Sequence, residues 1–222
     1  MSMKQLVIFL VIITTTKVYG QGIKHTNPID FLPQGYSLAQ KIIGDLNNDA
    51  IEDCVLLIQG TDKNKITKDQ NNDRVDRNRR GVIILFNKNN KYELAISNYD
   101  CFSSENEDGG TYFPPDLVLT IRNGNLYVEY AHGRYGYWQY IFRYQNSDFE
   151  LIGYFVSKGA PVIESETSIN FSTKRKLERI KAIQHEIDVF DMFNSKWTTI
   201  KMGTYLRLSE IPDFDVLDMN KY

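Results

Sequence analysis

Apolar and polar residues alternate along much of this chain with the two-residue period of β-strands. Segment 51–58 is instead almost continuously apolar, as expected for a strand that is buried on both faces of a sheet. Three later pairs of alternating segments are separated by short stretches rich in asparagine, which favour tight turns. These pairs are 81–86 with 92–96, 117–121 with 126–130, and 138–144 with 149–155. Three consecutive hairpins predict an antiparallel meander.

The rest of the chain has a weaker pattern. Two further strands are expected at 167–171 and 197–201. Residues 174–185 have a narrow apolar stripe at helical spacing, and residues 37–43 favour a second short helix. Residues 61–80 are polar without an aromatic side chain, which predicts a long exposed loop or excursion. Since no repeat of propeller length is found, the pattern predicts a mainly β fold: a single compact antiparallel β meander domain with one or two short helices.

The first twenty residues have the order of features found in a cleavable secretory signal. Lys4 precedes an unbroken apolar run, 6–13, and small residues follow up to Gly20. Such a run is too short to span a bilayer, which needs about 20 residues. We therefore expect residues 1–20 to be a signal peptide, with 21–222 as a periplasmic or secreted domain that has no membrane span. The alternative is a buried N-terminal strand or helix.

Charge and composition narrow the classes of function. The chain has 26 basic and 28 acidic residues, and the predicted signal contains two of the basic residues and no acidic one. The mature domain then carries a net charge near −4, which argues against a nucleic-acid-binding protein held by bulk charge. Fourteen tyrosines and twelve phenylalanines favour sheets and exposed binding surfaces over helical bundles.

Cys54 and Cys101 are the only cysteines in the sequence. In an oxidising compartment a lone pair most often forms a disulfide. Closing a loop of this length would stabilise the fold by about 4 kcal/mol. The alternative is two buried free thiols. Because neither cysteine has a partner at the spacing of metal ligands, we expect the disulfide Cys54–Cys101.

A short acidic stretch leads into the apolar strand at 51–58. Residues able to offer oxygen ligands stand at every second position: Asp45, Asn47, Asp49, Ile51 through its backbone carbonyl, and Asp53. A chain that curls around Ca²⁺ presents its oxygens with this spacing. The spacing therefore predicts a calcium site. The alternative is a turn in which Asp and Asn side chains bind their own backbone.

The run 44–53 resembles the acidic loop of the FG-GAP and VCBS-type repeats, in which Gly-Asp-Leu-Asn-x-Asp leads directly into an apolar strand. The resemblance implies a calcium-binding loop on an exported β-structure. Ala50 stands where the pattern usually has glycine, because the backbone there must turn without hindrance. This departure implies weaker affinity or a loop that is held without metal. Only the loop is carried over, since those repeats recur around a propeller.

A second copy of the acidic spacing lies within the polar segment 61–80. Asp69, Asn71 and Asp73 stand at alternate positions, but the ninth position is Arg77. Further arginines nearby would also oppose a bound cation: Arg74, Arg79 and Arg80. A solvated polar loop is therefore the preferred interpretation of this segment.

The densest aromatic and cationic cluster comprises His132, Arg134, Tyr135, Tyr137 and Trp138. Such residues dominate protein-binding hot spots, and planar rings also stack on sugars. The alternative is a hairpin connection whose rings fill the edge of the core. The acidic stretch 98–113 is a second candidate, which could supply carboxylates to a cation or contact a basic partner.

The chain contains no phosphate loop, His-Glu-x-x-His motif, nucleophile elbow or zinc-spaced set. The leading hypothesis is an exported non-enzymatic binding domain that recognises a protein or glycan, such as an envelope inhibitor or immunity protein. The rival is a hydrolase of cell-wall or extracellular polymer, with His132 beside acidic-loop carboxylates or Glu129. Segments 60–64, 78–81 and 142–154 resemble exported bacterial proteins to which no activity is assigned, which implies export and one compact unit.

Overall fold

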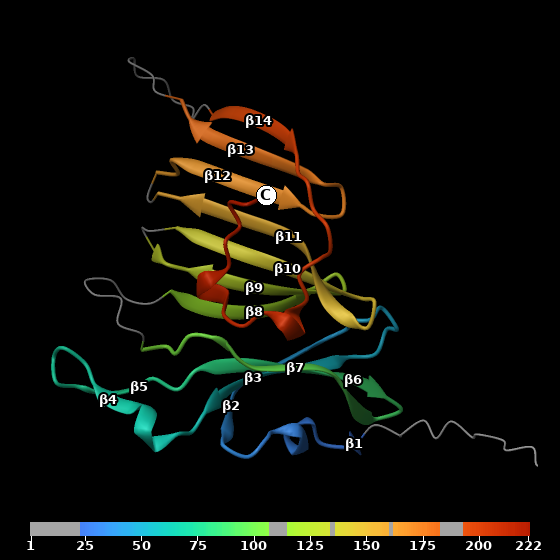
Figure 1. The fold of residues 1–222 in the computed structure, drawn as a ribbon. Helices are drawn as coiled ribbons and strands as arrows, with labels where there is room; N and C mark the ends of the chain where they lie inside the picture. The colour runs from blue at the N-terminus through green and yellow to red at the C-terminus, as the bar shows by residue number, and fades with distance from the viewer. Residues whose placement is uncertain (1–22, 107–114, 134–135, 160–161, 183–192) are drawn as a thin grey trace, which may run out of the picture.

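The computed structural model of this chain describes residues 23–106, 115–133, 136–159, 162–182 and 193–222. The described residues form mainly β-structure with short 3-10 turns, in antiparallel sheets of five, seven and two strands (Figure 1). The predicted mainly β, antiparallel fold is confirmed. The predicted signal peptide lies outside the described residues. No helix within the described part of the chain has the length and apolar character needed to cross a membrane.

The five-stranded sheet has two central strands that are buried on both faces. Both β3 and β6 consist almost entirely of buried residues, so the double burial predicted from the continuous apolar run at 51–58 is confirmed. The sheet has the order β1–β7–β6–β3–β2. Its strands are β1 (Lys24–His25), β2 (Tyr36–Gly44), β3 (Asp53–Gly60), β6 (Arg80–Lys88) and β7 (Lys91–Phe102).

The seven-stranded sheet is a meander, because every strand pairs with its neighbours in sequence. Its strands are β8 (Asp116–Arg122), β9 (Asn125–Ala131), β10 (Tyr137–Gln145), β11 (Asp148–Lys158), β12 (Ser165–Asn170), β13 (Arg175–Lys181) and β14 (Phe193–Thr199). The three hairpins expected from the sequence are β6–β7, β8–β9 and β10–β11. Their turns contain residue pairs with positive φ, as tight hairpins require: Asn89–Asn90, Asn123–Gly124 and Asn146–Ser147.

Both helices expected from the sequence are wrong. Residues 37–43 lie in β2, and the described part of 174–185 contains all of β13. Leu177 and Ile180, which would share one face of a helix, instead point to opposite faces of the sheet, since they are three residues apart in a strand. Both strands pair with neighbours along their length, and these non-local hydrogen bonds outweigh a weak helical stripe.

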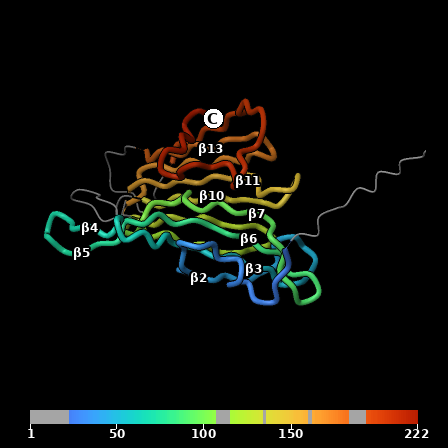
Figure 2. Tube along the Cα trace, turned by 60° about the horizontal axis from the view of Figure 1, so that its bottom comes forward, coloured from blue at the N-terminus to red at the C-terminus, as the bar shows by residue number. Residues whose placement is uncertain are grey.

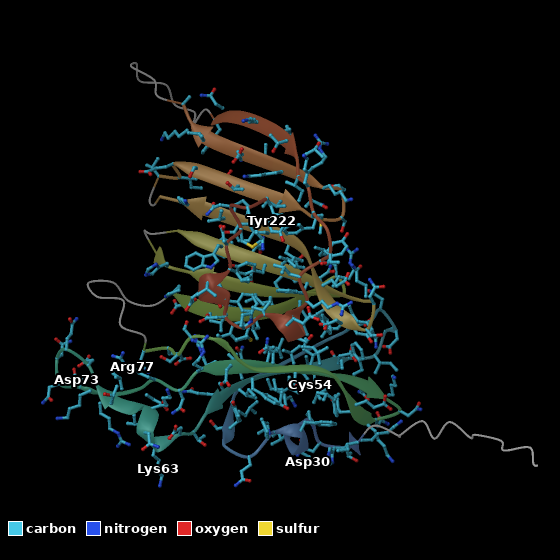
Figure 3. All side chains as sticks on the ribbon, viewed as in Figure 1. Asp30, Cys54, Lys63, Asp73, Arg77 and Tyr222 are labelled. Atoms are coloured by element: carbon cyan, nitrogen blue, oxygen red, sulfur yellow. The ribbon has the colours of Figure 1, made fainter. Side chains whose placement is uncertain are left out.

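The polar segment 61–80 is partly ordered as a hairpin. After a short 3-10 turn, η2 (Lys63–Lys65), the strands β4 (Ile66–Lys68) and β5 (Arg74–Asp76) pair with each other and with no other strand among the described residues. The hairpin projects sideways from the five-stranded sheet, as the positions of Asp73 and Arg77 in Figure 3 and of β4 and β5 in Figure 2 show. Residues 61–74 are mostly exposed, in agreement with the predicted exposed loop or excursion, whereas Asn78 and Arg80 at the end of the segment are buried.

The main core lies between the two sheets and includes the C-terminal segment. Inner residues of β3 and β6 join residues of β8–β11 and residues that follow β14 in one buried cluster. Two 3-10 turns, η4 (Leu208–Glu210) and η5 (Phe214–Val216), bring Leu208 and Phe214 into this cluster. Figure 1 shows the segment crossing the seven-stranded sheet. A smaller cluster covers the other side of the five-stranded sheet, where Phe31 of η1 (Pro28–Phe31) packs on β3 and β6.

The expected disulfide is absent, and both cysteines are buried free thiols. Cys54 packs in the smaller cluster whereas Cys101 packs in the main core, so the side chains lie on opposite faces of the five-stranded sheet. Cys54 pairs with Leu85, while Cys101 precedes Phe102, which pairs with Arg80. A separation of several residues along β6 corresponds to roughly 13–17 Å, far beyond the Cα separation of about 6 Å that a disulfide needs.

Candidate functional site

The calcium-type loop between β2 and β3 is folded around its own carboxylates. Asp45 Oδ1 accepts hydrogen bonds from the N–H groups two and three residues later, at 3.2 and 2.7 Å, and its Oδ2 accepts one from the N–H five residues later, at 2.9 Å. Asn47 and Asp49 each accept from the N–H two residues later, at 2.9 and 2.8 Å. These are Asx turns, so the loop has a sufficient set of internal bonds to hold its shape.

Asp53 closes the base of this loop. Its carboxylate is fully buried and accepts hydrogen bonds from the N–H of Leu46 at 2.9 Å and of Asn87 at 3.0 Å. Burial raises the pKa of Asp53 overall, although these two hydrogen bonds act in the opposite direction. Since each oxygen binds a backbone N–H, Asp53 joins the loop to the sheet.

The loop is also anchored to the seven-stranded sheet. Leu46 is buried in the main core, and the β8–β9 turn approaches so closely that a Cβ on Gly124 would lie 2.4 Å from Asn48 Oδ1. Ala50 has a φ of 65°, which is the left-handed conformation for which glycine is usual. Within the described ranges, no group of three or more His, Cys, Asp or Glu is arranged to hold a metal ion.

The second acidic spacing has the same local character. Asp69 Oδ1 accepts hydrogen bonds from the N–H of Asn71 and of Asp73, both at 2.9 Å. The carboxylate thereby closes the β4–β5 turn on the projecting hairpin. This observation supports the interpretation as a solvated polar turn.

The predicted aromatic patch is divided between two sides of the sheet. Tyr137 and Trp138 are consecutive in β10 and therefore point to opposite faces. Trp138 stacks on Tyr130 with ring centroids 5.3 Å apart, and it packs against the main core. The rings of His132 and Trp138 form an edge-on contact with centroids 6.5 Å apart. The other two members, Arg134 and Tyr135, lie outside the described residues. The prediction of a single binding surface that contains both Tyr137 and Trp138 is therefore wrong, because consecutive side chains of a strand point to opposite faces of the sheet.

Glu129, the carboxylate considered for a hydrolase, belongs to a hydrogen-bonded cluster. It accepts from Tyr137 Oη at 2.7 Å, from Arg122 Nη2 at 2.5 Å and from Thr120 Oγ1 at 3.0 Å. Burial alone would raise its pKa, but these three donors and the arginine charge lower it overall. The pKa of Tyr137 is raised to about 12 by burial and by its bond to Glu129. Such a carboxylate stays ionised, which is unsuited to a general acid.

His132 and Glu129 do not form a catalytic pair in this arrangement. Glu129 pairs in register with Gln139 and shares the face of Tyr137, whereas His132 contacts Trp138 on the opposite side. Glu105, at the start of the acidic loop, forms an ion pair with the buried Arg80 at 3.0 Å. Asp100 of the same stretch accepts hydrogen bonds from Tyr36 Oη at 3.1 Å. The other two carboxylates of 98–113, at 107 and 108, lie outside the described residues.

Tyr137 and Glu129 belong to a broad surface, which we call the outer face of the seven-stranded sheet. The strand registers place one residue of each strand in a continuous row across it: Val118, Glu129, Gln139, Phe155, Ser168, Leu177 and Trp197. None of these side chains belongs to the core clusters of the described residues. Trp197 is 56% exposed and Val118 42%. The outer face is thus an open sheet surface with apolar side chains.

Three arginines of the outer face stand over aromatic rings. The guanidinium carbon of Arg122 is 3.9 Å from the ring centroid of Tyr127, that of Arg175 is 4.2 Å from Trp197, and that of Arg179 is 4.6 Å from Phe193. This surface was not predicted from the sequence. The alternation of apolar and polar residues identifies the strands but does not show which strands lie side by side. The available signal was the two-residue alternation in the last two strands, which places Arg175 and Arg179 on one face of β13 and Phe193 and Trp197 on one face of β14.

Comparison of this chain with models of protein families, with curated proteins and with solved structures finds no match. The function is therefore argued from the geometry of the outer face and of the calcium-type loop.

Proposed function

We propose that this chain is an exported binding domain that recognises a protein partner through the outer face of its seven-stranded sheet. The observation that carries the proposal is the set of arginine-covered aromatic rings on a face that the described core leaves open. Aromatic residues and arginine provide most of the binding energy at protein interfaces. An envelope inhibitor or immunity protein is a specific form of this proposal.

A protein is favoured over a glycan because of the way the rings are presented. A sugar stacks on a bare ring face, whereas a guanidinium already covers one side of Tyr127 and of Trp197. Arg122 and Arg179 already bind Glu129 and Glu166. Arg175, which lies over Trp197, forms no ion pair among the described residues, and an arginine held against a ring loses fewer side-chain conformations when it binds a carboxylate. The geometry thus supports a partner that presents acidic side chains.

The charge of the outer face points in the same direction at the β12–β14 end. Registers place three basic residues of β13 on this face, Arg175, Arg179 and Lys181, against one acidic residue of β12, Glu166. Glu166 is engaged by Arg179 at 2.6 Å. This part of the face is therefore positive on a chain whose total charge is −2, which favours a partner with a negative surface.

Site-specific photo-crosslinking tests the surface with a matched control. A photoreactive residue is placed at Ser195 on the outer face or at Lys196, the next residue of β14, whose side chain points to the opposite face. We expect a protein adduct from position 195 and none from 196 in cells that express the full chain. We also expect Trp197→Ala to abolish the adduct and Ile180→Ala, on the opposite face, to retain it. Equal adducts from both positions would refute the assignment.

Calcium binding by Asp45, Asn47, Asp49, the carbonyl of Ile51 and Asp53 remains a proposal that the oxygen spacing supports. Asp49→Asn is the informative variant, because asparagine retains the oxygen that accepts from the backbone while removing one charge. If the loop binds Ca²⁺, added Ca²⁺ raises the melting temperature of the wild type by mass action and that of Asp49→Asn by less. No heat in calorimetry at millimolar Ca²⁺ would show that the Asx turns alone form the loop.

A further inference from the structure

A pocket of about 540 Å³ lies between the β10–β11 turn and the segment 203–210. This volume is within the range of about 300–1,000 Å³ that is usual for small-ligand sites. The hairpin lines it with Asn146 and Glu150, and the C-terminal segment lines it with Gly203, Thr204, Tyr205, Arg207 and Glu210. The antiparallel bridge between Glu150 and Arg207 joins the two walls of the pocket.

The pocket contains a buried carboxylate whose partners are neutral. Glu150 is only 4% exposed, and it accepts hydrogen bonds from Gln145 Nε2 at 2.5 Å and from Asn146 Nδ2 at 3.2 and 3.3 Å. Arg207 stands opposite Glu150 in the bridge, yet its guanidinium is directed to Glu210, 3.5 Å away and largely exposed. Among the described residues, no basic group forms an ion pair with Glu150.

A buried charge that lacks an opposite charge is costly unless a ligand supplies one. We propose that this pocket binds the cationic head of a basic side chain or other organic cation, either a guanidinium or an ammonium. Glu150 provides the charge, Asn146 and Thr204 provide neighbouring polar atoms, and Tyr205 provides a ring beside which an aliphatic stem or a planar cation can lie. Because its residues are distinct from the row on the outer face, this site does not depend on the proposed function.

Titration of the isotope-labelled full chain with three small probes tests the inference by NMR. The probes are the Nα-acetyl methylamides of arginine, lysine and citrulline, the last being an uncharged analogue of arginine. We expect saturable shifts of the Thr204 and Tyr205 amide resonances with at least one cationic probe, at a dissociation constant on the order of 1 mM or below, and none with citrulline. The stronger cationic probe identifies the head group. Equal binding of citrulline, or no saturable shift with any probe, would overturn the proposal.

Two variants alter the pocket in independent ways. Glu150→Gln removes the charge and should weaken binding by about thirtyfold or more. Gly203→Leu leaves Glu150 intact but places a side chain where no atom lies within 4 Å of the glycine's missing Cβ, so it should block the probe. Glu164→Gln, which removes the same charge at an exposed position, should bind as the wild type does. Trp197→Ala on the outer face should do the same.

The spectrum without probe reports whether each variant is folded. If Glu150→Gln does not fold, the affinity of Gly203→Leu for the probe tests the proposal by itself. Affinity of the wild-type strength in a folded Gly203→Leu variant would show that the probe binds elsewhere.

Discussion

Ala50 adopts a backbone conformation in which its methyl group is unfavourable, so replacing it by glycine should stabilise the protein. Its φ of 65° lies in the left-handed region, which costs a residue with a Cβ roughly 1–2 kcal/mol. Glycine relieves this strain but loses about 0.5–1 kcal/mol more through the conformational entropy of the unfolded chain. We therefore expect Ala50→Gly to raise the free energy of unfolding by about 0.5–1 kcal/mol.

Ala131→Gly is the matched control for this change. Ala131 is exposed and extended in β9, so the same substitution there brings the entropic loss without relief of strain. It should lower the free energy of unfolding by about 0.5–1 kcal/mol. The difference between the two variants then isolates the strain at position 50, about 1–2 kcal/mol. Urea unfolding followed by tryptophan fluorescence measures both values. Equal destabilisation by the two variants would show that the loop does not hold Ala50 in the left-handed region.

Three further predictions concern the rings, the thiols and the carboxylate cluster. Trp138→Ala should lower the free energy of unfolding by about 2 kcal/mol or more, since a stacked ring that packs on the core is lost. Trp197→Ala should lower it by less than about 1 kcal/mol, because Trp197 is exposed. Urea unfolding of both variants tests this contrast. A thiol reagent should label both cysteines in denaturant without reductant and neither in the folded protein, because both are buried and burial raises the pKa of Cys54 to about 11; mass spectrometry reports the count, and a single disulfide-linked species would contradict it. Because the pKa of Glu129 is lowered in the folded state, its ionised carboxylate stabilises the fold at pH values above the ordinary pKa of 4.5, and this contribution is lost as pH falls through the folded-state pKa. The difference in unfolding free energy between the wild type and Glu129→Gln should therefore be constant near neutral pH and become smaller in acid. A difference that becomes larger in acid would contradict the lowered pKa.

The sequence predicts the hairpins well because their information is local. Alternation and asparagine-rich turns locate β6–β7, β8–β9 and β10–β11, and the continuous apolar run locates β3. The edge strand β2 and the β12–β14 part of the meander have little buried surface to impose a clear period, which is why β2 and β13 resemble weak helices. Cys54 and Cys101 could not be placed from the sequence, because their separation depends on how β3 pairs with β6 and β7.

The candidate site was predicted less well for the same reason. The acidic loop is one continuous segment, so its turn geometry follows from its residues, including the need for a left-handed conformation at Ala50. The outer face combines residues from seven strands, and only their register shows that Trp197 lies in one row with Glu129. Consecutive aromatic residues such as Tyr137 and Trp138 look like one patch in a sequence, whereas a strand sends them to opposite faces.

The connectivity of the two sheets also sets the order in which the chain can fold. Each strand of the meander pairs with a neighbour in sequence, so its contacts are of low contact order and can form as successive hairpins. The main core between the sheets is completed only by residues that follow β14, including Leu208 and Phe214. During synthesis or refolding, docking of the two sheets is therefore expected to be a late step, because it requires the residues that follow β14.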